Sequence, residues 1–250
     1  MGTGELTPVS PPIPRDDAAL FLDIDGTLID IAPTPQAVKV PAGLPALLGR
    51  LSRRFAGSLA MVSGRCLDDI DLLFRPFRFP AAGIHGAERR DALGNHHYTG
   101  LTSEDLAPAR AELRRFAARH PALLLEDKGR SLALHFRHAP ELETAVREAL
   151  ELARIQLSPE AQLQPGHCVI ELKGGSASKR SAIEEFMQEP PFAGRVPIYL
   201  GDDVTDMEAL NHVQTAGGLG IYVGPEPQPG LGWLPRPAAV LEWLRSLDTK

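Results

Sequence analysis

Short apolar runs alternate along the chain with longer stretches in which apolar residues recur at helical spacing. The runs at 19–25 and 58–63 have the composition of buried strands, because each is short and rich in apolar residues. Between them, apolar residues three and four positions apart predict a helix with one apolar face, formed by Leu44, Leu47, Leu48, Leu51 and Phe55. This order of strand, helix and strand predicts a parallel βαβ unit.

The same alternation of short apolar runs and helical stretches resumes after residue 177. It predicts helices over 178–187, 206–213 and 238–247 and strands over 196–201 and 220–223. We expect the proline-rich segment 225–237 to be a surface loop before the last helix. The pattern therefore predicts an α/β fold with a Rossmann-like core, in which helices cover both faces of a mainly parallel sheet.

The order of elements changes between these two stretches. An amphipathic helix over 104–120 precedes strands over 123–126 and 131–138, a second helix over 141–155 and a strand over 168–173. This α+β order interrupts the βαβ pattern and predicts a second domain inserted into the first. The predicted division is a disordered leader over 1–17, a core over 18–102 and 174–250, and an inserted α+β cap domain over 103–173.

The strands of the insertion alternate in polarity. Apolar side chains at every second position fall on one face, namely Leu132, Leu134, Phe136, Cys168, Ile170 and Leu172. We expect this face to pack on the inserted helices and the other face to present polar side chains outward, among them Glu171, Lys173, His135 and Arg137. Such a face is also typical of an ordinary solvated antiparallel sheet.

Length and composition narrow the class of protein. A chain of 250 residues with 43% hydrophobic residues can bury a sizeable core. The net charge of -6, without long runs of lysine or arginine, gives no basic face for nucleic acid. The two cysteines are far apart, and the chain has neither a signal-peptide pattern nor an 18-residue apolar run. We expect a cytoplasmic monomer that binds neither nucleic acid nor membranes.

Two carboxylates stand at the end of the first predicted strand. Asp23 and Asp25 follow the apolar run 18–22 and, two positions apart in an extended segment, point the same way. They would project into the crevice at the carboxyl end of the strand, where open α/β sheets bind ligands. The pair favours a divalent cation, although Asp-Gly after a strand is also an ordinary turn signal.

Three further motifs follow core strands or open a helix. They are Ser63-Gly64-Arg65, Lys179 after a segment rich in glycine and serine, and Gly201-Asp202-Asp203-Val204-Thr205-Asp206. Each motif alone is compatible with a turn, a solvated lysine or a helix cap. Together they supply what phosphoryl transfer requires: a metal ion, a positive charge and hydrogen-bond donors around the phosphate.

These motifs define a candidate metal and phosphate site. The predicted ligands of a Mg²⁺ ion are Asp23, the Asp25 main-chain carbonyl and Asp202. Asp203 and Asp206 would support these ligands from the adjoining loop. Lys179 would add positive charge beside a helix N-terminus, which already favours anions. The phosphate would also contact Thr27, Ser63 and Gly64.

In this order, the motifs resemble those of the haloacid dehalogenase (HAD) superfamily of aspartate-nucleophile phosphatases. The resemblance implies a HAD core with an inserted cap domain. It also implies that Asp23 attacks phosphorus to form an aspartyl-phosphate and that Asp25 acts as general acid and base. Lys179 completes the catalytic set, because its charge offsets repulsion between the carboxylate and an anionic substrate.

Four segments are similar to the trehalose-6-phosphate phosphatase family in particular. They are DIDGTLIDIAP at 23–33, GIHGAE at 83–88, LEDKGRSLALHFR at 125–137 and VIELK at 169–173. The resemblance spans nearly all of residues 20–224 and implies hydrolysis of trehalose 6-phosphate, the last step of trehalose biosynthesis. It assigns the sugar to Glu126, Lys128 and Glu171, and we add His85 and Arg65 as candidate substrate contacts.

The chain also departs from the family pattern. Gly174 stands where a proline is frequent, Arg180 where a glycine follows the lysine, and Met207 where a glutamate is usual. A HAD phosphatase acting on sucrose phosphate, mannosylglycerate phosphate or a hexose phosphate therefore remains an alternative. The charges at 126–128 are also compatible with a surface hairpin. A mutase, or a non-catalytic sugar-phosphate sensor that should have lost the catalytic residues, is a further alternative.

Overall fold

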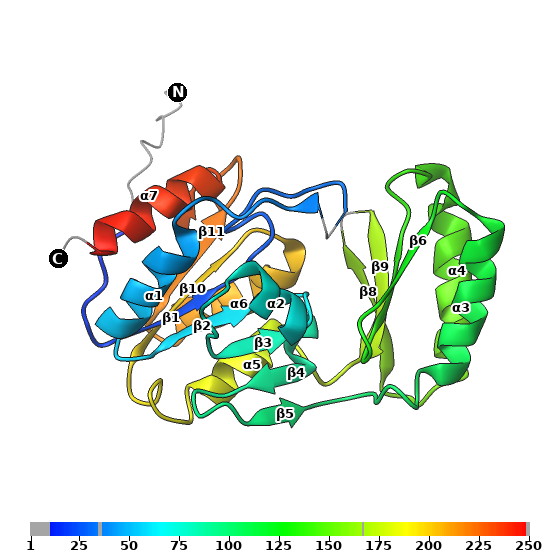
Figure 1. The fold of residues 1–250 in the computed structure, drawn as a ribbon, viewed down its shortest axis with the longest axis horizontal. Coiled ribbons are helices and arrows are strands. Elements are labelled where there is room, and N and C mark those ends of the chain that lie inside the picture. Colours follow the sequence, from blue (N-terminus) through cyan, green and yellow to red (C-terminus); the bar gives the residue numbers. More distant parts are fainter. Residues whose placement is uncertain (1–10, 35–36, 167, 249–250) are drawn as a thin grey trace.

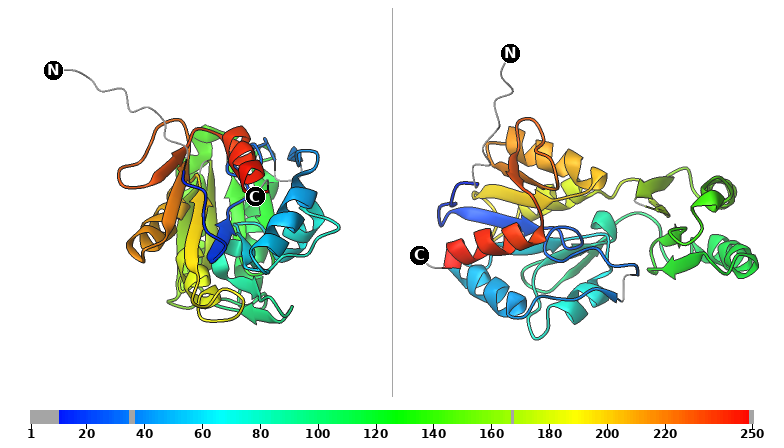
Figure 2. Two further views of the ribbon diagram at one scale, coloured as in Figure 1. Left: turned by 90° about the vertical axis from the view of Figure 1, so that its left-hand side faces the viewer. Right: turned by 90° about the horizontal axis from the view of Figure 1, so that it is seen from above.

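A computed structural model describes residues 11–34, 37–166 and 168–248 of the chain. These residues form a larger body around an eight-stranded sheet and a smaller body around a four-stranded sheet (Figure 1). The smaller body is inserted between β5 and α5, and its helices lie on the side away from the larger body (Figure 2). We call the larger body the core and the smaller one the cap. Within the described ranges, every helix is too short or too polar to cross a membrane.

The core sheet has the strand order β12-β11-β10-β1-β2-β3-β4-β5. The strands from β12 to β3 pair in parallel, and β4 and β5 add antiparallel pairs at one edge. The predicted mainly parallel sheet is therefore confirmed. The strand bounds are Ala18–Leu22 (β1), Leu59–Val62 (β2), Ala81–Gly83 (β3), Glu88–Arg90 (β4), His96–Tyr98 (β5), Val196–Gly201 (β10), Leu219–Val223 (β11) and Gly232–Leu234 (β12).

Helices cover both faces of this sheet, as predicted. The side chains of β1 show why, because Leu20 and Leu22 pack into one apolar cluster and Phe21, which points the other way, packs into a second. The first cluster includes α1 (Leu44–Arg54), α2 (Leu67–Leu73) and α7 (Pro237–Asp248). The second includes α5 (Lys179–Phe186) and α6 (Val204–Thr215). β1 is buried on both faces, as parallel strands in doubly wound sheets are.

The cap is a two-layer α+β unit. Its antiparallel sheet has the order β6-β7-β9-β8, with bounds Leu124–Asp127 (β6), Leu132–His135 (β7), Ala161–Gly166 (β8) and Val169–Gly174 (β9). The predicted apolar face packs on α3 (Ala107–Arg119) and α4 (Glu143–Arg154). The polar face does not present all its side chains to solvent, because it is turned toward the core. Glu171 and Lys173 are only 5% and 4% exposed.

Several elements differ from the prediction. β1 ends at Leu22 rather than at residue 25, because the chain turns there and Gly26 adopts a left-handed conformation with φ of 84°. The proline-rich segment 225–237, predicted as a loop, contains the edge strand β12. The predicted leader over 1–17 is too long, because Pro11 is buried and its carbonyl accepts a hydrogen bond from Trp243 Nε1. Residues 1–10 of that leader lie outside the described residues.

Two chain segments, which we call the linkers, join the core to the cap. They approach each other at Gly100 and Gly174. A Cβ added to Gly174 would lie 2.8 Å from both the Gly100 Cα and the Leu101 N atom. These are backbone atoms of the opposite linker and have no rotamer that would relieve the contact. Gly100 itself has a φ of 81°, a conformation that favours glycine. The small size of these residues therefore sets how closely the linkers approach.

We expect Gly174→Ala to lower the free energy of unfolding by about 1–3 kcal/mol, the usual cost of overpacking. It should also lower catalytic turnover, because the linkers must separate and shift the cap. Gly175→Ala is the matched control, since the atoms nearest to its Cβ would belong to the flexible Gln162 side chain and not to the backbone. Urea unfolding and steady-state kinetics compare the two, and equal effects would contradict this account of the linkers.

Candidate active site

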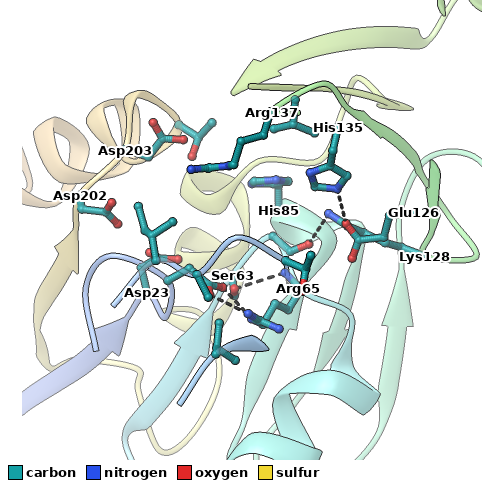
Figure 3. A pocket seen from close by; sticks show the side chains of 18 of the residues that line it. Asp23, Ser63, Arg65, His85, Glu126, Lys128, His135, Arg137, Asp202 and Asp203 are labelled. Carbon is teal, nitrogen blue, oxygen red and sulfur yellow. Dashed lines mark hydrogen bonds and ion pairs between the residues drawn. The ribbon is translucent and has the colours of Figure 1, made fainter. Parts of the chain in front are cut away.

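Three strands of the core sheet deliver charged or hydroxyl side chains to one edge. Asp23 follows β1, Ser63 follows β2 and Asp202 follows β10. Because β1 lies between β2 and β10 in the sheet, these carboxyl ends are adjacent. Lys179 joins them from the first turn of α5. The motifs that the sequence separates by up to 180 residues thus line one cavity, together with Asp25, Gly64 and Asp203 (Figure 3).

Asp23 and Lys179 form the buried centre of the site. The Lys179 Nζ atom lies 2.8 Å from Asp23 Oδ1 and 2.6 Å from Asp206 Oδ1, and all three side chains are almost fully buried. Burial raises the pKa of Asp23 well above its ordinary value, and the Lys179 charge opposes this rise. Burial would lower the pKa of Lys179, but the Asp206 and Asp23 carboxylates raise it, so this ammonium is charged.

Asp202 approaches Asp23 from the neighbouring strand. The Thr27 hydroxyl lies 3.0 Å from Asp202 Oδ1 and 3.3 Å from Asp23 Oδ2, so it bridges the two carboxylates. Burial raises the pKa of Asp202 to about 7, and the charge of Asp206 adds to the rise. A Cβ on Gly26 would lie 2.0 Å from Asp202 Oδ2, so glycine is required for this approach. Thr27 lies among the carboxylates and not on an open phosphate-binding surface.

The carboxylates fit a hard divalent cation. One oxygen each from Asp23, Asp202 and Asp206 lies within 4.8 Å of the others. All the donors are oxygen atoms, which Mg²⁺ prefers, and one Lys179 charge does not balance three carboxylates. Both oxygens of Asp206 are already committed, because Oδ1 accepts from Lys179 and Tyr199 and Oδ2 accepts from two main-chain N–H groups. Asp23 and Asp202 are therefore the better ligands.

Asp203 and Asp206 organise the loop that carries Asp202. Asp203 is the N-cap of α6, and its side chain accepts a hydrogen bond from the Val204 N–H. Asp206 Oδ2 accepts from the N–H groups of Asp202 and Asp203, at 3.1 and 3.0 Å. Asp206 thus holds both the loop and Lys179 in place. The contacts that cap helix α6 therefore also support the site.

The Ser63-Gly64-Arg65 turn faces Asp25. The Arg65 N–H donates to Ser63 Oγ at 3.2 Å, and the guanidinium forms two 2.6 Å hydrogen bonds with the Asp25 carboxylate (Figure 3). Arg65 was predicted as a substrate contact, but in the structure its guanidinium binds the Asp25 carboxylate. The Gly64 carbonyl accepts a hydrogen bond from Lys128 Nζ at 2.9 Å. This turn therefore contacts both the first strand and the cap.

The predicted sugar-binding residues lie across the cavity on the cap. Lys128 Nζ is 3.2 Å from Glu171 Oε2, which is also 3.3 Å from His85 Nε2 of the core. Burial would raise the pKa of Glu171, but Lys128 and His85 lower it. Burial lowers the pKa of His85 and so favours its neutral form. Glu126 accepts a hydrogen bond from the His135 ring at 2.8 Å. Glu126, Lys128, Glu171 and His85 are thus brought together at the junction of cap and core.

His135, Arg137 and Thr205 are among the residues outside the predicted site that also line the cavity. Arg137 extends from the cap toward Asp203, whereas His135 points to Glu126 (Figure 3). Their signal in the sequence was the alternation over the predicted strand 131–138, which placed both on the polar face. The pattern did not show that this face closes over the core. Thr205 carries no signal beyond its place in the Asp202–Asp206 segment.

Solved structures show which class of fold this is. A trehalose-6-phosphate phosphatase related protein superposes with a TM-score of 0.75 at 24% identity, covering 92% of this chain and 96% of that one. The C-terminal domain of the Candida albicans trehalose-6-phosphate phosphatase also gives 0.75, at 20% identity, with 93% and 92% covered. A HAD-superfamily phosphatase from Bacteroides thetaiotaomicron gives 0.57 at 17% identity, with 92% and 93% covered. The fold is that of the HAD superfamily.

Sequence comparisons specify the family, and the chain belongs to the trehalose-phosphatase family, whose sequence model matches residues 21–229. A protein of Sinorhizobium fredii named "Probable trehalose-phosphate phosphatase" is 45% identical over 228 residues, which cover 90% of this chain and 85% of the relative. The trehalose-6-phosphate phosphatase of Escherichia coli is 40% identical over 231 residues, covering 92% and 86%. The resemblance seen in the sequence motifs is confirmed.

Proposed function

We propose that this chain hydrolyses trehalose 6-phosphate to trehalose and phosphate through an aspartyl-phosphate on Asp23. The observation that carries the proposal is the buried contact between Asp23 and Lys179, at a cavity whose other wall is the charged face of the cap. The family and the names of relatives 40–45% identical over most of both chains support the same activity. We also propose a cytoplasmic monomer, in keeping with its two free cysteines.

The reaction proceeds in two displacements at phosphorus. In the first, an oxygen of Asp23 attacks, the bond from phosphorus to the sugar oxygen breaks, and Asp25 gives its proton to that oxygen. In the second, water attacks the aspartyl-phosphate, Asp25 takes a proton from the water, and Asp23 is released with free phosphate. Lys179 stays charged throughout and lowers the cost of bringing an anionic phosphate to a carboxylate. Ser63 and the Gly64 N–H donate to the phosphate oxygens.

Magnesium is the cofactor that these donors fit. We propose that Asp23, Asp202 and the Asp25 main-chain carbonyl hold it, with Asp206 fixing the Asp202 loop from behind. When bound, the ion neutralises phosphate oxygens and reduces repulsion between the substrate and Asp23.

The cap supplies the specificity for the sugar. Glu126, Lys128 and Glu171 offer carboxylate acceptors and an ammonium donor to the hydroxyl groups of a disaccharide. In the described structure, Lys128 contacts Glu171 Oε2 and the Gly64 carbonyl, and Glu171 Oε2 also contacts His85 of the core, whereas the buried Glu171 Oε1 has no hydrogen-bond partner. Sugar hydroxyls would replace these contacts, so the cap opens to admit the substrate and closes over it to exclude water. Relatives acting on another sugar phosphate would differ here and not in the core.

We expect Glu126→Lys to lower kcat/KM for trehalose 6-phosphate by about 10²-fold, because it removes a charged hydrogen-bond acceptor and adds a second ammonium beside Lys128. Turnover of p-nitrophenyl phosphate, which has no sugar, should change much less. Glu148→Lys is the control, since Glu148 is exposed on the cap helix α4. Equal losses with both substrates would remove Glu126 from sugar recognition.

A further inference from the structure

The arrangement of Arg65 and Asp25 is more specific than a surface ion pair. Arg65 Nε lies 2.6 Å from Asp25 Oδ2, and Arg65 Nη2 lies 2.6 Å from Asp25 Oδ1. Two donors of one planar group thus bind both oxygens of one carboxylate, which fixes the plane of the carboxylate as well as its position. An ammonium would bind without this directional control.

Arg65 is the anchored partner of the pair. Its main-chain N–H donates to Ser63 Oγ at 3.2 Å, and its carbonyl accepts from the Ile84 N–H at 2.9 Å. The carbonyl is so closely packed that a Cβ on Gly83 would lie 2.7 Å from it. The Arg65 side chain is 10% exposed, whereas the Asp25 side chain is 36% exposed and lines the cavity. The buried arginine therefore sets the orientation of the more accessible carboxylate.

We propose that Arg65 is a positioning residue, which aims the Asp25 carboxyl group at the leaving oxygen of the substrate. The proposal rests on the proposed function, in which Asp25 delivers that proton. When one Asp25 oxygen carries the proton, the other keeps its hydrogen bond to the guanidinium, so the group stays oriented. The proton then passes to the leaving oxygen as its bond to phosphorus breaks. Arg65 contributes no atom to the reaction and acts through Asp25.

The dependence of kcat/KM on the leaving group distinguishes positioning of the Asp25 acid from binding of the sugar or the phosphate. p-Nitrophenyl phosphate and benzyl phosphate are similar in size and carry no sugar. Nitrophenolate leaves without a proton, whereas the benzyl alkoxide must be protonated as it departs. kcat/KM reports the steps up to loss of the leaving group, so it isolates the first displacement. A residue that orients the acid matters for benzyl phosphate and much less for p-nitrophenyl phosphate.

We expect Arg65→Met to lower kcat/KM for benzyl phosphate by about 10²-fold or more, the scale of general acid catalysis. The loss for p-nitrophenyl phosphate should be below about tenfold. Arg65→Lys keeps a cation beside Asp25 and is the second variant should the first fold poorly. It should show the same selective loss, only smaller, because an ammonium lacks the two-pronged geometry.

A double-mutant cycle with Asp25→Asn completes the test. If Arg65 acts through Asp25, Arg65→Met should add almost nothing to the Asp25→Asn variant on benzyl phosphate. Equal losses on both substrates, or additive losses in the cycle, would overturn the proposal. A wild-type enzyme that releases no phosphate from trehalose 6-phosphate would instead refute the proposed function. That outcome is distinguishable, because the leaving-group comparison uses neither sugar nor cap specificity.

Discussion

Replacing Asp23 with asparagine is expected to lower phosphate release by about 10⁴-fold or more, as loss of a nucleophile does in other covalent enzymes. The amide cannot form the aspartyl-phosphate and no longer offers a charged metal ligand. The protein should still fold, because asparagine has the same shape and Lys179 keeps its 2.6 Å contact with Asp206. Burial disfavours the charged form of Asp23. Removing this charge in the Asp23→Asn variant should therefore not lower the melting temperature.

Phosphate release and thermal unfolding are measured on the same preparation of the Asp23→Asn variant. A folded variant that keeps wild-type turnover would remove Asp23 from the nucleophile role. An acid-stable phosphate label that forms on the wild-type protein, maps to Asp23 and is absent from the variant would support the aspartyl-phosphate. A label that maps to another residue would contradict it.

Replacing Lys179 with methionine is expected to affect both activity and stability. Turnover should fall by about 10³-fold, because the donor that offsets phosphate charge is lost. The free energy of unfolding should fall by about 3 kcal/mol or more, since Asp23 and Asp206 would remain buried without their cation. Urea unfolding in EDTA avoids compensation by added metal, and steady-state phosphate release measures the activity.

Arg180→Met is the matched control for Lys179, because it changes the next cation on the same helix. Arg180 is 43% exposed and pairs with Glu184 and Glu208 at the surface. Exposed pairs contribute at most about 1 kcal/mol, so stability and turnover should change little. If Lys179→Met resembled this control, the buried contact with Asp23 would have no role in the site.

The sequence pattern predicted the core strands that form uninterrupted apolar runs. β1, β2 and β10 were found because each is a short apolar run beside a helical stretch, and their carboxyl ends carry the motifs. The three-residue strands β3, β4 and β5 were missed, because so few residues show no period. β12 was missed because prolines surround it, and an edge strand tolerates them.

The sequence predicted many of the residues that line the cavity, though not His135, Arg137 or Thr205, and it did not predict their contacts. The order of the motifs brought Asp23, Lys179 and Asp202 together, because parallel strands end at one edge of the sheet. Nothing in the sequence indicates that Arg65 binds Asp25, or that Lys128 reaches the Gly64 carbonyl. Such pairs depend on how loops and the cap fold over the sheet, and local spacing does not encode these tertiary contacts.

We propose that the core hydrolyses a phosphate ester whose sugar the cap selects. The most direct test measures phosphate release from trehalose 6-phosphate, sucrose 6-phosphate, glucose 6-phosphate and mannosyl-3-phosphoglycerate, each with Mg²⁺ and with EDTA. We predict the highest kcat/KM for trehalose 6-phosphate and loss of activity in EDTA. A higher kcat/KM for any other substrate would contradict the assignment of the sugar, and activity that survives EDTA would contradict the metal-dependent mechanism.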